Sequence, residues 1–174
     1  MDHAKQQAEA QANHISALTA ALGMDWDKLE ELKDERNDLI SATQDPESDD
    51  EQAEAEAALR DWDAEFLEEL DELIATAGDW KDGDEVKSAI EEMPLSVESR
   101  NGWTSFGDTP TLEEFRITLC TGGPHVEIRG EFDTHGQPYR AWLQYQDWGT
   151  PMTQYFDIEQ STLLNFCSNF YWGE

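Results

Sequence analysis

The acidic run from Asp45 to Glu72 constrains the fold of this chain more than any other segment. It holds 14 acidic residues, and Arg60 is the only basic residue among its 28 positions. Its second half places apolar side chains at i, i+4, i+8, i+11 and i+12, the pattern of one helix face: Trp62, Phe66, Leu70, Leu73 and Ile74. Its first half offers mainly alanines between the carboxylates, so it has little to bury. The run predicts a long helix over Glu51–Ala77 with an apolar stripe along its second half.

The whole chain is strongly acidic, with 40 Asp and Glu against 11 Lys and Arg and a formal net charge of −29. Residues 1–100 hold 30 of the acids and eight of the bases. Such a field repels nucleic acids and anionic membranes and attracts strongly basic surfaces. The composition therefore argues against direct binding of nucleic acid or membrane and favours a basic protein partner.

Two further helices are expected before the acidic run. Ala4–Leu22 precedes Gly23, which suits a helix cap, and carries apolar residues at helical spacing: Ile15, Leu18 and Leu22. Asp25–Ser41 carries a narrower stripe, formed by Trp26, Leu29, Leu32, Leu39 and Ile40. Its opening, DWDKLEEL, returns nearly unchanged as DWDAEFLEEL at 61–70. Because two copies are too few for a helical solenoid, we interpret the repeat as two helices that start alike.

From Leu95 onward the sequence is typical of strands. LSVESR and WTSF flank Asn101–Gly102, a dipeptide that favours a tight hairpin turn. FRITLC and HVEIRGEF flank TGGP, and YRAWLQYQ follows DTHGQP; apolar and polar residues alternate in these segments. This order predicts an antiparallel meander.

The last segment predicts a helix that covers one side of this sheet. Asp157 is expected as the N-cap, with Gln160 at the third helical position. The apolar face of this helix would comprise Leu163, Leu164, Cys167, Phe170 and Tyr171. We therefore predict an α+β fold. An acidic helical module of about three helices would occupy residues 1–93, and an antiparallel sheet with a C-terminal helix would occupy 94–174.

Cysteine usage and hydropathy predict a soluble cytoplasmic protein. Cys120 and Cys167 are too few for a disulfide framework, and no apolar stretch follows a basic N-terminus, which argues against secretion. The longest apolar runs are only a few residues, too short for a transmembrane helix.

Cys120 and His125, with an acid such as Glu127 or Asp133, are the residues that suggest nucleophilic catalysis. No cysteine-protease signature surrounds Cys120, and a Cys that ends an alternating strand is typically structural. We therefore expect no enzymatic activity and no cofactor.

Other polar features favour structural roles. TGGP lacks the Lys-Ser/Thr of a phosphate-binding loop, and DWKDGDE at 79–85 lacks the spacing of a calcium-binding EF-hand loop. We expect a hairpin loop at the first and a linker with a helix cap at the second. The four His share no metal-ligand spacing, so no metal is expected. Simple alternation allows Arg116, Arg129 and Arg140 on one sheet face, and pairing with Glu127 and nearby acids is favoured.

The acidic run has the linear charge density of a DNA strand. If helical throughout, it would be about 42 Å long at ~1.5 Å per residue. Its net charge of −13 would then place one charge every ~3.2 Å, close to the ~3.4 Å phosphate spacing of one B-DNA strand. No Lys lies within the run to relieve its self-repulsion. A solvated or disordered acidic face is the ordinary alternative.

Two resemblances bear on function. Residues 94–151, from PLSVESRNGW through QDWGTP, resemble an uncharacterised domain of bacterial plasmids and integrative elements. The acidic helical half is similar in character to the DNA-mimic inhibitors with which phages and mobile elements block restriction and CRISPR systems. Together these resemblances imply an anti-defence role in the cytoplasm of a bacterial host.

We therefore predict a non-enzymatic DNA mimic that binds a basic DNA-binding partner, a CRISPR effector or a restriction enzyme. Trp62, Trp80 or Trp103 would serve as anchors if exposed. The alternative is an acidic adaptor or assembly factor that pairs through its amphipathic helices, and either function is compatible with a homodimer. The carboxylates expected to mimic phosphates are Asp49, Asp50, Glu51, Glu54, Glu56, Asp61, Glu65, Glu68, Glu69 and Glu72.

Overall fold

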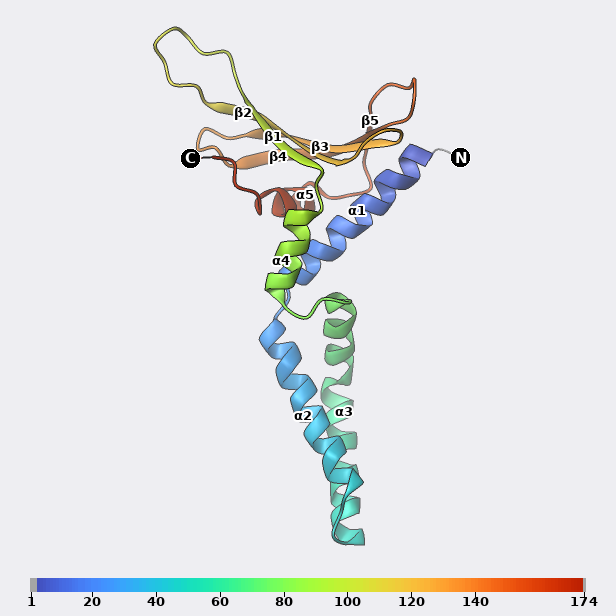
Figure 1. Cartoon of the computed structure of the whole chain (residues 1–174). Coiled ribbons are helices and arrows are strands. Elements are labelled where there is room, and N and C mark those ends of the chain that lie inside the picture. The colour runs from blue at the N-terminus through green and yellow to red at the C-terminus, as the bar shows by residue number, and fades with distance from the viewer. Residues whose placement is uncertain (1–2, 174) are drawn as a thin grey trace. The chain divides into compact units, whose positions relative to one another are not determined.

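The computed structural model describes residues 3–173 and divides the chain into two compact units. One unit combines the described parts of residues 1–22 and 84–174, and we call it the sheet unit. The other comprises residues 23–83, and we call it the acidic hairpin. The fold is α+β, as the sequence predicts, with five helices and one antiparallel five-stranded sheet among the described residues (Figure 1).

The sheet is an antiparallel meander in which each strand pairs with the next along the chain, in the order β1-β2-β3-β4-β5. Its strands are β1 (Ser96–Asn101), β2 (Leu112–Cys120), β3 (His125–Phe132), β4 (Pro138–Gln146) and β5 (Thr153–Tyr155). The alternation recognised in the sequence sets the two faces. One face buries apolar side chains, including Phe115, Ile117, Val126, Ile128 and Leu143.

Helices α1 (His3–Leu22) and α5 (Gln160–Cys167) cover this apolar face (Figure 1). Ala4, Ala8 and Ala12 are buried along α1 at four-residue intervals, so small side chains line part of its packing surface. Ile15 and Leu18 continue the buried face of the same helix.

The predicted boundary at residues 93 and 94 differs from this division, because α1 packs against β4 and α5 and belongs to the sheet unit. The sequence shows α1 as a strong helix former but does not say what its alanines contact. The sheet unit also includes most of α4 (Gly83–Glu92), a short helix that the sequence analysis did not predict, with Val86 and Ile90 buried.

The acidic hairpin consists of α2 (Trp26–Gln44) and α3 (Asp49–Ala77), which pack against each other. Its core is small and contains four buried residues, Leu29, Leu32, Leu70 and Ala77. Trp62, Phe66 and Leu73 of the predicted stripe are partly buried against this core, as expected, whereas Ile74 is 44% exposed. No residue of α3 before Leu70 is buried, which agrees with the prediction that its first half has little to bury.

The structure also corrects several details of the prediction. WTSF is not a strand, and neither Asn101 nor Gly102 has the positive φ of a tight hairpin turn; a loop over 102–111 joins β1 to β2 instead. Asp157 is not the N-cap of the last helix, because that helix begins at Gln160, after Glu159. The helix ends at Cys167, so Phe170 and Tyr171 lie beyond it. The short strand β5 was not predicted.

Within residues 3–173, no helix combines the length and the apolar character that crossing a membrane requires.

Candidate functional site

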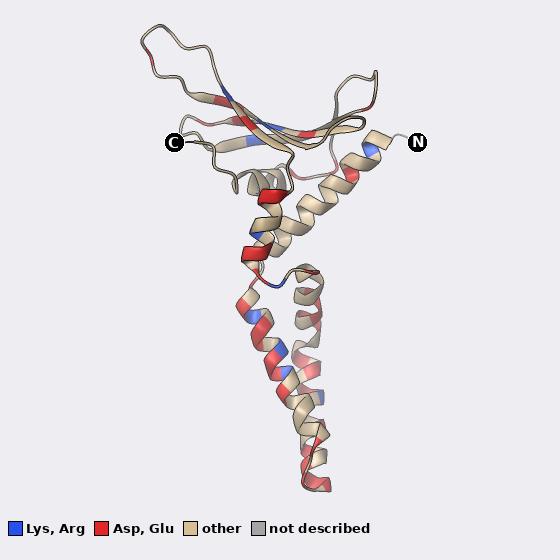
Figure 2. Cartoon of the chain, viewed as in Figure 1, with Lys and Arg blue, Asp and Glu red and all other residues tan. Residues whose placement is uncertain are grey.

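The acidic hairpin exposes all ten of the carboxylates that the sequence analysis selected. Residues 23–83 hold 23 acidic and five basic residues, a net charge of −18. Figure 2 shows acidic positions along both helices of the hairpin, with a few basic positions among them. The acidic run is therefore continuous in space as well as in sequence.

Three of the ten carboxylates have a structural role at the start of α3. The Ser48 hydroxyl caps the helix by accepting from the Glu51 amide at 3.3 Å, and the Glu51 carboxylate accepts from the Glu47 amide at 2.9 Å. Asp49, Asp50 and Glu51 form the first turn, where the helix dipole favours negative charge. These residues favour helix formation whatever the hairpin binds.

The other seven carboxylates differ in their partners. Glu56 accepts from the Gln52 side-chain amide at 3.2 Å, Asp61 Oδ1 lies 3.9 Å from Arg60 Nε, and Glu69 interacts with the charge of Lys28. The remaining four have no side-chain hydrogen bond or ion pair with any residue that the structure describes: Glu54, Glu65, Glu68 and Glu72.

These four carboxylates lie on the face of α3 opposite its buried residues. Steps of three, four, seven or eleven residues return to nearly the same side of a helix. By the same spacing, Asp50 and Asp61 join the four on this face. The resulting row spans about 33 Å at ~1.5 Å per residue. We call this set the outer acidic row: Asp50, Glu54, Asp61, Glu65, Glu68 and Glu72.

Two of the three bases of α2 bind elsewhere in the hairpin. Arg36 Nε donates to Asp63 Oδ1 at 2.8 Å, which joins the two helices. Lys28 Nζ lies 3.0 Å from Glu31 Oε2 on the same helix. Neither of these bases pairs with the outer acidic row, and Lys33, the third base of α2, forms no ion pair with any described residue, so the charge of the row is not neutralised by α2.

The second candidate is the face of the sheet that α1 and α5 do not cover. Cross-strand register places four Glu and four Arg on it: Glu98, Arg100, Glu114, Arg116, Glu127, Arg129, Glu131 and Arg140. We call this set the charged face. Each Arg pairs with a Glu: Arg100 with Glu114, Arg116 with Glu98, Arg129 with Glu127 and Arg140 with Glu131. The prediction that these arginines pair with nearby acids is confirmed.

Glu127 belongs to the charged face and is only 2% exposed. Its Oε1 accepts from Arg129 Nε at 2.8 Å and from Gln144 Nε2 at 2.6 Å, and its Oε2 lies 3.0 Å from His125 Nε2. Burial by itself raises the pKa of a carboxyl, but the bonds from His125, Arg129 and Gln144 outweigh it and lower the pKa of Glu127. The sequence predicts Glu127 as an ion-pair partner but does not indicate its burial.

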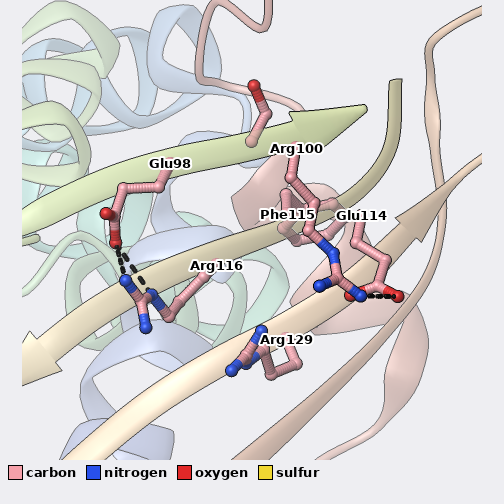
Figure 3. A pocket seen from close by; sticks show the side chains of 7 residues that line it. Glu98, Arg100, Glu114, Phe115, Arg116 and Arg129 are labelled. Atoms are coloured by element: carbon pink, nitrogen blue, oxygen red, sulfur yellow. Dashed lines mark hydrogen bonds and ion pairs between the residues drawn. The ribbon is translucent and has the colours of Figure 1, made fainter. Parts of the chain in front are cut away.

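A cavity of about 290 Å³ opens on the charged face beside β1. Arg116 and Arg129 lie directly opposite each other on β2 and β3 at this cavity (Figure 3). Like charges in that position repel, but each Arg has its own carboxylate: Glu98 pairs with Arg116, and Glu127 pairs with Arg129. The charged face is therefore a balanced ion-pair ladder and not a basic patch.

The residues considered for nucleophilic catalysis bond to other groups in the structure. Cys120 Sγ donates to the Pro124 carbonyl at 3.5 Å, while the ring of His125 bonds to Glu127. Burial raises the pKa of the Cys120 thiol, which disfavours the thiolate that a nucleophile requires. Asp133 accepts from the backbone amides of His135 and Gln137 in the β3–β4 turn.

The remaining sequence features have simple positions. TGGP forms the loop between β2 and β3, and DWKDGDE spans the end of the hairpin and the start of α4. Over residues 3–173, no group of three or more His, Cys, Asp or Glu is placed to hold a metal ion. Of the three proposed anchors, Trp103 is fully exposed, whereas Trp62 and Trp80 are partly buried.

Comparison with known proteins returned no family model, curated protein or solved structure that matches this chain. The resemblances to a plasmid-borne domain and to DNA-mimic inhibitors stay predictions.

Proposed function

We propose that this protein is a non-enzymatic inhibitor that mimics DNA. Its acidic hairpin would occupy the DNA-binding channel of a basic bacterial defence complex, a CRISPR effector or a restriction enzyme. The observation that carries the proposal is the outer acidic row, six exposed carboxylates on one face of a single helix. The four of them that lack a partner among the described residues are free to replace phosphates.

The repulsion within the row supports a role in binding. Glu65, Glu68 and Glu72 are three or four residues apart, and each such like-charge pair destabilises a helix by ~0.2–0.5 kcal/mol. Helix α3 has only Leu70 and Ala77 buried to offset this repulsion. A basic channel would relieve the repulsion on binding and would gain affinity from it.

The alternative adaptor function has less support in the hairpin. An adaptor would pair through an apolar stripe, but Leu70 of that stripe already packs with Leu29 and Leu32 of α2. Ile74 is the only large apolar residue of α3 that is clearly exposed. The surface that the hairpin offers to a partner is therefore mainly carboxylate.

The experiment compares two variants of equal net charge. One carries Glu54→Gln, Glu65→Gln, Glu68→Gln and Glu72→Gln. The control carries Glu91→Gln, Glu92→Gln, Asp108→Asn and Asp157→Asn, four exposed acids of the sheet unit. Binding of each to a purified CRISPR effector and a purified restriction enzyme is measured across a salt series, with duplex DNA as competitor.

We expect the parent and the control to bind one of the enzymes, to be displaced by DNA and to bind less tightly as salt rises. Four exposed charge interactions of up to ~1 kcal/mol each imply a loss of about 10- to 1,000-fold for the hairpin variant. The proposal is refuted if a folded hairpin variant binds as tightly as the control at every salt concentration. It is also refuted if neither class of enzyme binds the parent.

A further inference from the structure

The edge strand β1 presents an unpaired side to solvent. All six of its residues are exposed, and among the residues that the structure describes β1 pairs only with β2. The outer edge of such a strand carries free N–H and C=O groups that can accept another strand. The opposite edge is formed by β5, which has only three residues. Of the two edges, β1 is therefore the better template for pairing.

The charges of β1 are self-complementary. Glu98 and Arg100 both project onto the charged face, and Ser99 lies midway between them on the other side of the strand. If two copies of β1 pair antiparallel about a two-fold axis at Ser99, Glu98 of each copy lies opposite Arg100 of the other. A shift by one side-chain pair in either direction would place Glu98 opposite Glu98, or Arg100 opposite Arg100. Opposite charges directly across a strand pair stabilise it and like charges destabilise it, so the sequence of β1 favours one register.

We propose that this protein forms a homodimer by antiparallel pairing of β1 with β1 of a second copy, with the two-fold axis at Ser99. The two sheets would join into one continuous sheet with α1 and α5 of both copies on the same face. This proposal does not depend on the function proposed for the hairpin.

The ion-pair ladder of the charged face supports this arrangement. Within one copy, Glu114 pairs with Arg100, and Glu98 pairs with Arg116 (Figure 3). Across the proposed interface, the order becomes Glu114, Arg100, then Glu98 and Arg116 of the second copy, so opposite charges alternate. The charged face has equal numbers of Glu and Arg, so the joining edges do not carry the acidic excess of the hairpin.

Exposed apolar residues at both ends of β1 would add contact area. Leu95 is 62% exposed and Val97 is 37% exposed, and Trp103 and Phe106 on the following loop are fully exposed. Leu95 immediately precedes β1 and Trp103 follows it by two residues, so in the register centred on Ser99 Leu95 of one copy and Trp103 of the other lie at the same end of the paired strands. Each aromatic side chain buries ~150–250 Å² when covered. Two from each copy would therefore add roughly 600–1,000 Å² to the strand pairing, which approaches the ~1,000 Å² of a specific interface.

The first test uses charge reversal in the full chain. Glu98→Arg alone gives two cations on the edge, and Arg100→Glu alone gives two anions. We expect each variant to be monomeric in analytical ultracentrifugation, while an equimolar mixture forms a heterodimer in which each Arg faces a Glu. In the mixture, the residue changed in Glu98→Arg still lies opposite Arg116 of its own β2, and the residue changed in Arg100→Glu still lies opposite Glu114. Mixing therefore does not remove the like-charge contact within either copy, and recovery of the dimer has to come from the contact between copies.

The second test fixes the register. In a Cys120→Ser background, Ser99→Cys places the new thiols opposite each other at the axis, and we expect a disulfide-linked dimer on mild oxidation. Val97→Cys is the matched control: its thiol would lie opposite Asn101 and roughly 14 Å from its own symmetry mate, four residues along the strand. A parent that stays monomeric at every concentration would overturn the proposal. So would a dimer that survives both charge reversals, or one that crosslinks through Val97→Cys but not through Ser99→Cys.

Discussion

Removal of the Glu127 carboxylate should destabilise the sheet unit more than removal of any exposed acid. In Glu127→Ala, the side chains of His125, Arg129 and Gln144 lose their acceptor. Breaking a fully buried ion pair costs ~3–5 kcal/mol. The side chains of Arg129 and His125 are 34% and 27% exposed, so water can replace part of the lost interaction. We therefore expect a loss of about 2–3 kcal/mol, between a fully buried pair and an exposed one.

Glu127→Gln should cost less, about 1–2 kcal/mol, because Gln keeps the shape of the side chain but turns one amide N–H toward a donor. The cost should also depend on pH. The folded-state pKa of Glu127 is lowered, so the unfolded state takes up the proton more readily. The contribution of the carboxylate is then complete at pH values above the ordinary Glu pKa of ~4.3 and disappears as the pH falls through the lowered folded-state value.

Native-state hydrogen exchange in urea can measure both effects, because peptides from β3 and β4 report on the sheet unit. Peptides from α3 belong to the acidic hairpin and serve as an internal reference within the same sample. This role of Glu127 is refuted if, at pH 7, Glu127→Ala lowers the protection of β3 and β4 by less than the substitution of an exposed acid does. It is also refuted if the difference between Glu127→Gln and the parent fails to shrink in acid.

Two further predictions follow from the packing of the sheet unit. Residues 94–174 expressed alone should lack cooperative unfolding in urea, because α1, which covers the apolar face of the sheet, is missing. Joining residues 1–22 to 84–174 through a short linker should restore cooperative unfolding. Cooperative unfolding of 94–174 alone would instead support the division predicted from the sequence. A thiol reagent should modify Cys120 slowly and leave Cys167 unmodified in the native protein, since burial raises the pKa of both thiols and Cys167 is completely buried; equal reaction of both would contradict the packing of α5.

Periodicity was sufficient to predict the long helices and the central strands. The stripe from Trp62 to Leu73 and the alternation of Phe115, Ile117 and Leu119 each follow one regular repeat, and the structure has a helix and a strand at these positions. Helix α4 has only Val86 and Ile90 as buried anchors over ten residues, too few for a recognisable stripe. The packing of α1 against the sheet is not predictable from the sequence for a related reason. Alanine at positions 4, 8 and 12 favours a helix whether or not the helix packs closely against another element.

The candidate site was predictable in its residues but not in their surroundings. Sequence alone identifies the ten selected carboxylates between Asp49 and Glu72, and helical spacing places six of them on one face. It does not show that Asp49, Asp50 and Glu51 also form a capped first turn, because that depends on the backbone at Ser48. It also cannot distinguish the buried Glu127 from an exposed Glu on the same face, because both occupy polar positions of an alternating strand.

The distribution of charge argues that solubility alone does not explain the acidic residues. On the charged face of the sheet, four Glu are each matched by an Arg, although these strands lie in a chain of net charge −29. In the hairpin, Lys28 and Arg36 of α2 bind Glu31 and Asp63, and within the outer acidic row only Asp61 has a base nearby among the described residues, Arg60 at 3.9 Å. A general requirement for solubility would be met by acids on any surface, and it would not require a 29-residue helix to carry adjacent like charges over so small a core. The concentration of carboxylates on one helix agrees with the proposed recognition of a basic groove.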